Sequence, residues 1–223
     1  MPRVLVTGAG RGIGYEFARQ YRADGCGVLA TCRNADAAAA LEALGCETAI
    51  LDVTDAAAID KFAAGIPMQS LDVAILNAGT AGQRTPVLEP TAPEDFDAVM
   101  RTNVFGPMRL IAVLADRVAR GGRIAVLSSR MGSIGITNNG RSVLYRASKA
   151  GLNAVARAAS FELASRGVIV VVLSPGWVKT DMGGPGADLD AATSVAGMRA
   201  AIAHTSAADS GRFVDHAEAS IVW

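Results

Sequence analysis

Short runs of β-branched and other apolar residues recur along this sequence, and longer Ala-rich stretches of helical character separate them. Runs that are apolar at every position are typical of strands buried on both faces of a parallel sheet. Strands that alternate with helices in this way predict a doubly wound α/β sheet with helices on both faces. The predicted strands are residues 4–7, 28–31, 48–51, 73–76, 124–127 and 168–173, with 213–214 as a short addition.

Composition favours one domain over residues 1–223. A chain of this length buries about 70% of the surface that it exposes when unfolded, so it needs no metal or disulfide to hold its core. It contains no internal repeat or low-complexity linker, and its 51% of hydrophobic residues exclude disorder. The 21 Lys and Arg residues balance the 21 Asp and Glu residues. We therefore expect neither nucleic acid nor an anionic membrane as a partner.

The apolar runs are too short for a membrane span or a secretion signal. The longest runs, such as 110–115, cover six residues, whereas a spanning helix needs about 20. Only residues 4–6 are apolar before a glycine-rich turn, so a cytoplasmic protein is expected. The cysteines Cys26, Cys32 and Cys46 lack the paired spacing of metal or disulfide frameworks. We expect reduced thiols that pack, and no metal site.

A glycine-rich turn follows the first predicted strand. The spacing is T-G-x-x-x-G-x-G, through Gly8, Gly12 and Gly14, and a helical stretch over 15–24 comes next. The strict G-x-G-x-x-G pattern does not fit, because Ile13 interrupts it. Glycines here let backbone N–H groups approach a pyrophosphate at the helix N-terminus. The turn predicts a Rossmann-type dinucleotide site; the alternative is a turn that only reverses the chain.

The second predicted strand ends near Arg33, where a dinucleotide fold contacts the adenosine ribose. An acidic residue there would repel a 2′-phosphate, and none is present. Arg33 and Arg11 could instead form charge-assisted hydrogen bonds to that phosphate, which favours NADP over NAD. The alternative is that both arginines are solvated surface charges.

Polar residues also follow the third and fourth predicted strands. Asp52, beside Val53, could accept a hydrogen bond from the adenine amino group. Asn77 could pin strand backbone, while Ala78 and Gly79 leave room for a cofactor. The alternatives are that Asp52 caps a helix beginning near residue 55 and that 77–79 is only a turn.

Tyr145 and Lys149 are spaced i, i+4 at the start of a predicted helix that reaches about residue 165. This spacing puts both side chains on one helix face. A phenol has a pKa of about 10, and a neighbouring ammonium favours the phenolate. The pair could therefore exchange a proton with an alcohol or carbonyl oxygen.

Together these residues resemble the short-chain dehydrogenase/reductase family. The matching positions are residues 7–14, 77–79, Asn103, Ser129, Tyr145, Lys149, 174–176 and Thr180. The stretches 128–134 and 145–153 are more similar to the C-factor and carbonyl-reductase-like branch of the family.

The resemblance implies a hydride transfer between a nicotinamide and a carbonyl or carbinol carbon, with Tyr145 moving the proton. Ser129 would hydrogen-bond the substrate oxygen, Lys149 the nicotinamide ribose and Thr180 the carboxamide, and Asn103 would hold a water on a proton path. The expected cofactor-binding residues are Gly8, Arg11, Gly12, Ile13, Gly14, Arg33, Asp52, Val53, Asn77, Ala78, Gly79, Tyr145, Lys149, Pro175, Gly176, Val178 and Thr180.

The catalytic serine has two candidates. The family usually places it about 13 residues before the tyrosine, whereas Ser129 lies 16 residues before Tyr145. The extra length falls in the polar segment 137–141, where an insertion is easily absorbed. Ser129 is preferred because it directly follows a predicted strand, and Ser133 is the competing assignment.

The region 181–212 is expected to cover the substrate, with a glycine-rich hinge at 183–186 and a short tail at 215–223. Met182 and Met198 could line an apolar pocket or could pack in the core. His204 and His216 are expected to be surface or tail residues rather than bases.

These observations predict an NADP-dependent oxidoreductase for the carbonyl or secondary alcohol of a small, mostly apolar substrate. The alternative is a nucleotide-binding signalling or interaction protein, similar to the C-factor, that retains the scaffold. A sugar-nucleotide epimerase is disfavoured because about 45 residues follow Thr180, too few for a further substrate domain. The resemblance also implies a homodimer or homotetramer, assembled through predicted helices at about 94–120 and 145–165.

Overall fold

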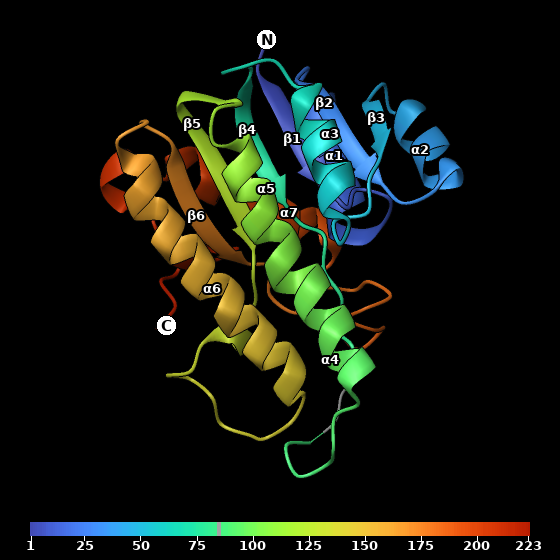
Figure 1. The fold of residues 1–223 in the computed structure, drawn as a ribbon, viewed down its shortest axis with the longest axis vertical. Coiled ribbons are helices and arrows are strands. Elements are labelled where there is room, and N and C mark those ends of the chain that lie inside the picture. Colours follow the sequence, from blue (N-terminus) through green and yellow to red (C-terminus); the bar gives the residue numbers. More distant parts are fainter. Residues whose placement is uncertain (84–85) are drawn as a thin grey trace.

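The seven strands that the structure describes form one parallel sheet. The structure is a computed structural model, and it describes residues 1–83 and 86–223. The strands are β1 (Arg3–Thr7), β2 (Gly27–Cys32), β3 (Glu47–Ile50), β4 (Leu71–Leu76), β5 (Val118–Leu127), β6 (Ile169–Ser174) and β7 (Arg212–Asp215). The strand order is β3-β2-β1-β4-β5-β6-β7, so the chain starts in the middle and winds outward in both directions (Figure 1).

Helices cover both faces of the sheet, which confirms the predicted doubly wound fold. The helices are α1 (Gly12–Ala23), α2 (Ala35–Glu42), α3 (Ala56–Ala64), α4 (Pro93–Met100), α5 (Gly106–Leu114), α6 (Val143–Ala164) and α7 (Ala191–His204), with the π-helical turn η1 (Arg101–Phe105) and the 3₁₀ turns η2 (Arg130–Gly132) and η3 (Ala207–Asp209). Neighbouring residues of one strand point to opposite faces. Val4 and Val6 accordingly pack in one core cluster with α1 and α7 residues, and Leu5 packs in the other with α3, α5 and α6 residues.

The long helix predicted over about 94–120 is wrong at its C-terminal end. Helix α5 ends at Leu114, and Val118 already pairs with Leu71 of β4. The β4–β5 register shifts just beyond this pair, where Gly121 adopts a left-handed conformation with φ of 82°. Pairing with β4 therefore overrides the local helical preference of this segment.

The structure also tests the predictions for the last strand, the cysteines and Met198. Phe213 and Val214 belong to β7, which is parallel to β6, and so the short additional strand is confirmed. All three cysteines are free and buried. Met198 is fully buried in the cluster beneath α7, so it packs and does not line a pocket. Among the described residues, no helix has both the length and the apolar character that crossing a membrane requires.

The tail at residues 215–223 has no helix, but it is held in place. Ser220 forms an antiparallel bridge with Val214, and Ile221 is 8% exposed. The ring of Trp223 lies 5.3 Å from the ring of Phe213, centroid to centroid. The tail therefore folds back against β7 and runs antiparallel to it.

Candidate active site

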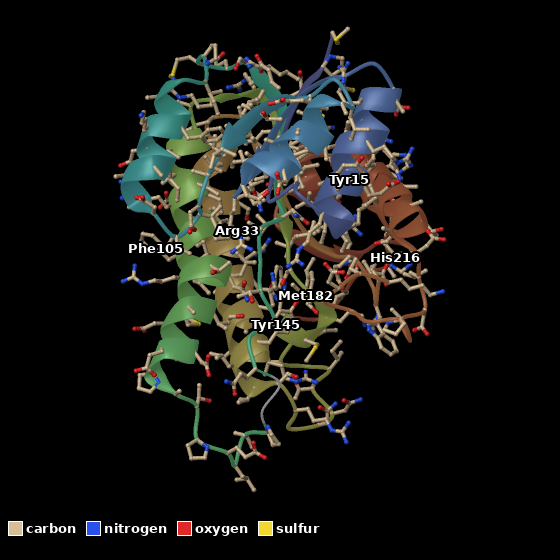
Figure 2. All side chains as sticks on the ribbon, turned by 90° about the vertical axis from the view of Figure 1, so that its right-hand side faces the viewer. Tyr15, Arg33, Phe105, Tyr145, Met182 and His216 are labelled. Atoms are coloured by element: carbon tan, nitrogen blue, oxygen red, sulfur yellow. The ribbon has the colours of Figure 1, made fainter. Side chains whose placement is uncertain are left out.

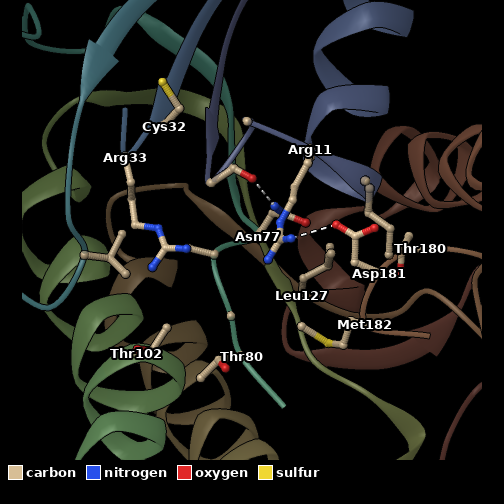
Figure 3. Close-up of a pocket in the computed structure, with 18 of the residues that line it drawn as sticks. Arg11, Cys32, Arg33, Asn77, Thr80, Thr102, Leu127, Thr180, Asp181 and Met182 are labelled. Atoms are coloured by element: carbon tan, nitrogen blue, oxygen red, sulfur yellow. Dashed lines mark hydrogen bonds and ion pairs between the residues drawn. The ribbon is translucent and has the colours of Figure 1, made fainter. Parts of the chain in front are cut away.

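A cavity of about 530 Å³ lies at the carboxyl ends of the central strands. This is where ligands bind in open parallel sheets, because the strand order reverses there. The turns that follow β1, β2, β4 and β6 contribute to its wall (Figure 3). Of the predicted site residues, the cavity is lined by Gly8, Arg11, Gly12, Ile13, Gly14, Arg33, Asp52, Val53, Asn77, Ala78, Gly79, Tyr145, Lys149, Pro175 and Thr180.

The glycine turn leaves space that a side chain would fill. Gly8 and Gly12 have φ of 66° and 55°, in the left-handed region that favours glycine. A Cβ on Gly14 would lie 2.4 Å from Nδ2 of Asn77. Asn77 in turn donates from Nδ2 to the carbonyls of Thr7 and Gly8, at 3.2 and 2.9 Å. Asn77 thus pins the end of β1 to β4, as the sequence suggested, and the turn is held close to the β4 loop.

Two arginines line the cavity beside the ends of β1 and β2 (Figure 3). Arg33 follows β2 and is exposed. Arg11 donates to Asp181 across the cavity, at 2.7 Å, and both partners are about three-quarters exposed. An exposed pair of this kind contributes only about 0–1 kcal/mol. Arg11 can therefore exchange Asp181 for another anion at little cost.

Asp52 lines the same cavity, and it does not cap the following helix. Its carboxylate accepts from the backbone N and the Oγ1 of Thr54, both at 2.8 Å. These hydrogen bonds, followed in size by the charge of Arg33, hold the pKa of Asp52 below its usual range. Asp55 caps α3 instead, since its carboxylate accepts from Ala57 N and Ala58 N. The cap alternative for Asp52 is therefore wrong.

Tyr145 and Lys149 lie together in the first turns of α6, where their spacing placed them. The Nζ atom of Lys149 is 5.8 Å from the centroid of the Tyr145 ring. Lys149 is 4% exposed and donates to the carbonyl of Leu127 at 2.8 Å. Burial lowers the pKa of Lys149 to about 8, because desolvation disfavours the ammonium. Figure 2 shows Tyr145 on the same side of the molecule as Met182 and Arg33.

Asn103 is fully buried behind the cavity, in the π-helical turn η1 between α4 and α5. Its side chain accepts from Thr80 N at 2.8 Å and donates to Thr80 O at 2.8 Å. It also donates to Oγ of Ser148 at 2.9 Å. Asn103 therefore joins α6 to the loop after β4, and its proposed role in holding a water stays a prediction.

The three serines after β5 have different surroundings. Oγ of Ser128 donates to Oδ1 of Asn153. Oγ of Ser129 accepts from Met131 N at 3.1 Å, a bond that leaves its own proton for another acceptor. Ser133 is 1% exposed and donates to the carbonyl of Val222 in the tail. Ser133 is thus committed to the tail, which favours Ser129 for the substrate, although Ser128 is the one of these three that lines the cavity.

The loop after β6 meets the prediction in part. Pro175 and Thr180 line the cavity, whereas Gly176 and Val178 do not. Gly176 has φ of 79°, and a Cβ there would lie 2.6 Å from Leu189. Val178 is 4% exposed and forms a bridge with Leu189. Both residues therefore hold the shape of the loop from behind.

The two histidines differ from each other. His204 is exposed, as expected, and its Nδ1 lies 3.0 Å from the Glu218 carboxylate. His216 lies in the tail and is half-buried, with its Nδ1 next to Gly176. The fold places it there because β7 ends next to the loop after β6.

Several lining residues were not predicted from the sequence. Some of them follow strand ends and could have been found from that position alone. Others, such as Asp181, become lining residues only because the loop after β6 lies across from the glycine turn. Met182, which the sequence offered for a pocket or for the core, lines the cavity. The additional lining residues are Gly10, Cys32, Asn34, Ala37, Leu51, Thr54, Thr80, Ala98, Thr102, Leu127, Ser128 and Asp181.

The comparisons with known proteins agree with this geometry. The sequence profile of the short chain dehydrogenase family matches residues 2–188. This chain belongs to the short-chain dehydrogenase family. The predicted family is therefore confirmed.

Known proteins that are similar to this chain include the following three. The C-signal protein of Myxococcus xanthus is 37% identical over 73% of this chain and 98% of its own length. The 3-oxoacyl-acyl-carrier-protein reductase FabG of Escherichia coli is 35% identical over 80% of this chain and 74% of its own length. The NADPH-bound carbonyl reductase from chicken fatty liver superposes with a TM-score of 0.90 and 32% identity, over 100% of this chain and 99% of that one.

Proposed function

We propose that this short-chain dehydrogenase is an NADP-dependent oxidoreductase that transfers a hydride between the nicotinamide and a carbonyl or secondary alcohol. One observation carries the proposal: a single cavity runs from the glycine turn and Arg33 to Tyr145 and Lys149. A site with that layout holds a dinucleotide at one end and a proton donor at the other.

The residues present fit a dinucleotide. A Cβ on Gly8 would lie 2.8 Å from the Cα of Ala78, so the glycine turn and the β4 loop form a cradle that only small residues allow. Backbone N–H groups at the start of α1 would hold the pyrophosphate. Lys149 would bond the nicotinamide ribose, and Thr180 the carboxamide. When bound, the cofactor supplies or accepts the hydride.

The chain's own residues would handle the proton. Tyr145 would donate its phenolic proton to the substrate oxygen during reduction and accept one during oxidation. The nearby ammonium of Lys149 stabilises the resulting phenolate by its charge. Ser129 would donate a hydrogen bond to the same substrate oxygen as negative charge develops on it. Asn103 would keep the β4 loop in position beside them.

NADP is the preferred cofactor because Arg11 and Arg33 line the end of the cavity where the adenosine would bind. The end of β2 carries no carboxylate that would repel a 2′-phosphate. Arg33 and Arg11 would form charge-assisted hydrogen bonds to the 2′-phosphate. The chicken carbonyl reductase described above has NADPH bound, which supports the same choice for this chain. NAD lacks the phosphate and would bind less tightly.

The substrate is proposed to be small and mostly apolar. Met182 lines the cavity next to the catalytic end, and the segment 181–212 that begins there would cover the substrate. Asp181 is already paired with Arg11 on the cofactor side. The apolar thioether of Met182 therefore favours a ligand without charge.

A panel of aldehydes and ketones with NADPH, followed at the absorbance of the reduced cofactor, tests the proposed activity. We expect turnover with at least one apolar carbonyl compound and little with NADH. Tyr145→Phe should lower kcat by about 10² to 10⁴ while NADPH still binds, because only the proton is lost. Tyr15→Phe, which changes a tyrosine outside the cavity lining, is the matched control. An undiminished rate in Tyr145→Phe would contradict the assignment.

A second candidate is a nucleotide-binding signalling protein that keeps the scaffold, and the similarity to the C-signal protein favours it. It predicts tight NADPH binding without turnover of any carbonyl compound in the panel. The presence of Asn103, Ser129, Tyr145 and Lys149 together argues for the enzyme.

A further inference from the structure

The turn that carries Ser129 is held from two sides. We call residues 129–135 the serine turn. On the inner side, Asn153 donates to the Gly132 carbonyl at 3.2 Å. A Cβ on Gly132 would lie 2.8 Å from Lys149, so the turn packs directly on α6. This side ties the turn to the helix that carries the proton donor.

The outer side is held by residues 222–223 of the tail. Ser133 donates from Oγ to the carbonyl of Val222, and Gly135 N donates to the carbonyl of Trp223 at 3.0 Å. A Cβ on Gly135 would lie 2.9 Å from the Val222 side chain. The turn and residues 222–223 are thus in close backbone contact over several residues.

The tail is itself anchored to the sheet, so it can hold the serine turn in a fixed position. Trp223 packs on Phe213 of β7, and Ile221 N donates to the Phe213 carbonyl at 2.8 Å. Arg130, inside the serine turn, reaches Asp215 at the end of β7, with 3.6 Å between the charged atoms. The outermost strand and the tail together form a rigid support for the turn.

We propose that Ser133 and Trp223 are positioning residues that hold Ser129 in place through the tail. This role rests on the proposed carbonyl reduction. Only one short turn separates Ser133 from Ser129: Gly132 N donates to the Ser129 carbonyl at 2.8 Å, and Ser133 N to the Arg130 carbonyl at 3.1 Å. A displacement of Ser133 would therefore also displace Ser129. Neither Ser133 nor Trp223 lines the cavity, so we expect the affinity for NADPH to be independent of both.

Ser133→Ala tests the hydroxyl contact and Trp223→Ala tests the ring contact. Each should lower kcat about tenfold, since a small displacement of a group that must meet the substrate oxygen is costly. The dissociation constant for NADPH should not change. The isotope effect with NADPH deuterated at the transferred position should rise, because hydride transfer becomes more rate-limiting. A loss of folded protein alone would lower the rate without changing either quantity.

Two controls match the variants. Ser160→Ala removes another buried serine that donates to a backbone carbonyl, at 2.7 Å from Arg157 O, on α6. Trp223→Phe keeps an aromatic ring against Phe213. Both controls should retain the wild-type isotope effect.

Hydrogen exchange over residues 129–137 gives a readout that needs no turnover. We expect faster exchange there in Ser133→Ala and Trp223→Ala than in the controls. Unchanged exchange together with an unchanged isotope effect would overturn the positioning role. A loss of activity in Ser133→Ala as complete as in Ser129→Ala would also overturn it, and would make Ser133 the catalytic serine. If exchange rises while the wild type reduces no carbonyl compound, the tail contact is supported and the proposed function fails.

Discussion

Burial of the Lys149 ammonium costs folding free energy, because the charged group loses its contact with water. It is 4% exposed, it donates to one backbone carbonyl, and burial lowers its pKa to about 8. An exposed lysine of the unfolded chain has a pKa of about 10.4. The folded protein therefore binds this proton less tightly than the unfolded chain does, and the protein tolerates that cost where a cation is useful.

A stability measurement against pH tests this value. Below about pH 8 both states hold the proton, so the penalty is fully present; it is relieved as pH rises from about 8 to 10. Wild type should therefore gain up to about 3 kcal/mol of unfolding free energy relative to Lys149→Met over that range. Urea denaturation at several pH values measures the difference. Lys61→Met, at an exposed lysine, should show no such trend, and a flat difference for Lys149→Met would contradict the buried charge.

Arg33 is the residue on which cofactor choice is expected to depend most. Replacing it by Ala should weaken NADPH binding about 10- to 100-fold, because a charge-assisted hydrogen bond to phosphate is lost. NADH binding should change little. Fluorescence titration with both cofactors measures this, with Arg166→Ala as a control, since Arg166 pairs with Asp116. Equal losses for the two cofactors would mean that Arg33 does not contact the 2′-phosphate.

At the scale of elements, the π-helical turn η1 joins parts of the chain that strand order alone would leave separate. It carries Asn103, whose side chain bonds Thr80 after β4 and Ser148 on α6. The extra residue of a π turn is a common feature of functional sites, because it turns a side chain inward without ending the helix. Here it ties the loop after β4 to the helix of Tyr145.

Asn103→Ala should leave two backbone groups of Thr80 without partners. We expect the unfolding free energy to fall by about 2 kcal/mol and carbonyl reduction to fall with it. Chemical denaturation and steady-state kinetics check both effects. Asn138→Ala, in an exposed loop, is the matched control and should be neutral. If Asn103→Ala were as stable as wild type, the β4 loop would have other support.

At the scale of the whole molecule, we expect a homodimer or homotetramer. Exposed apolar side chains lie on α4, α5 and α6: Phe96 is 48% exposed, Met108 47% and Phe161 67%. Burying such groups between copies of the chain would favour association by the hydrophobic effect. Sedimentation equilibrium should give two or four copies, and Phe161→Glu should weaken the assembly. A monomeric wild type at micromolar concentration would contradict this expectation.

What the sequence determined by itself depends on local spacing. The alternation of apolar strands and Ala-rich helices gives the doubly wound sheet, because each element must bury one face or both. The glycine spacing from Gly8 to Gly14 and the one-turn spacing of Tyr145 and Lys149 are likewise set within a single element. Such features hold in any fold that keeps those elements, so they could be predicted before the structure was known.

What only the tertiary structure decided depends on contacts between distant segments. Val118 is in a strand because β4 lies beside it, and Met198 is in the core because α7 crosses the sheet. Ser133 is tied to the tail because the Val222 carbonyl, 89 residues further along the chain, accepts a hydrogen bond from its hydroxyl. Nothing in the local sequence encodes these partners, since the free energy of such a contact exists only once the chain has brought both groups together.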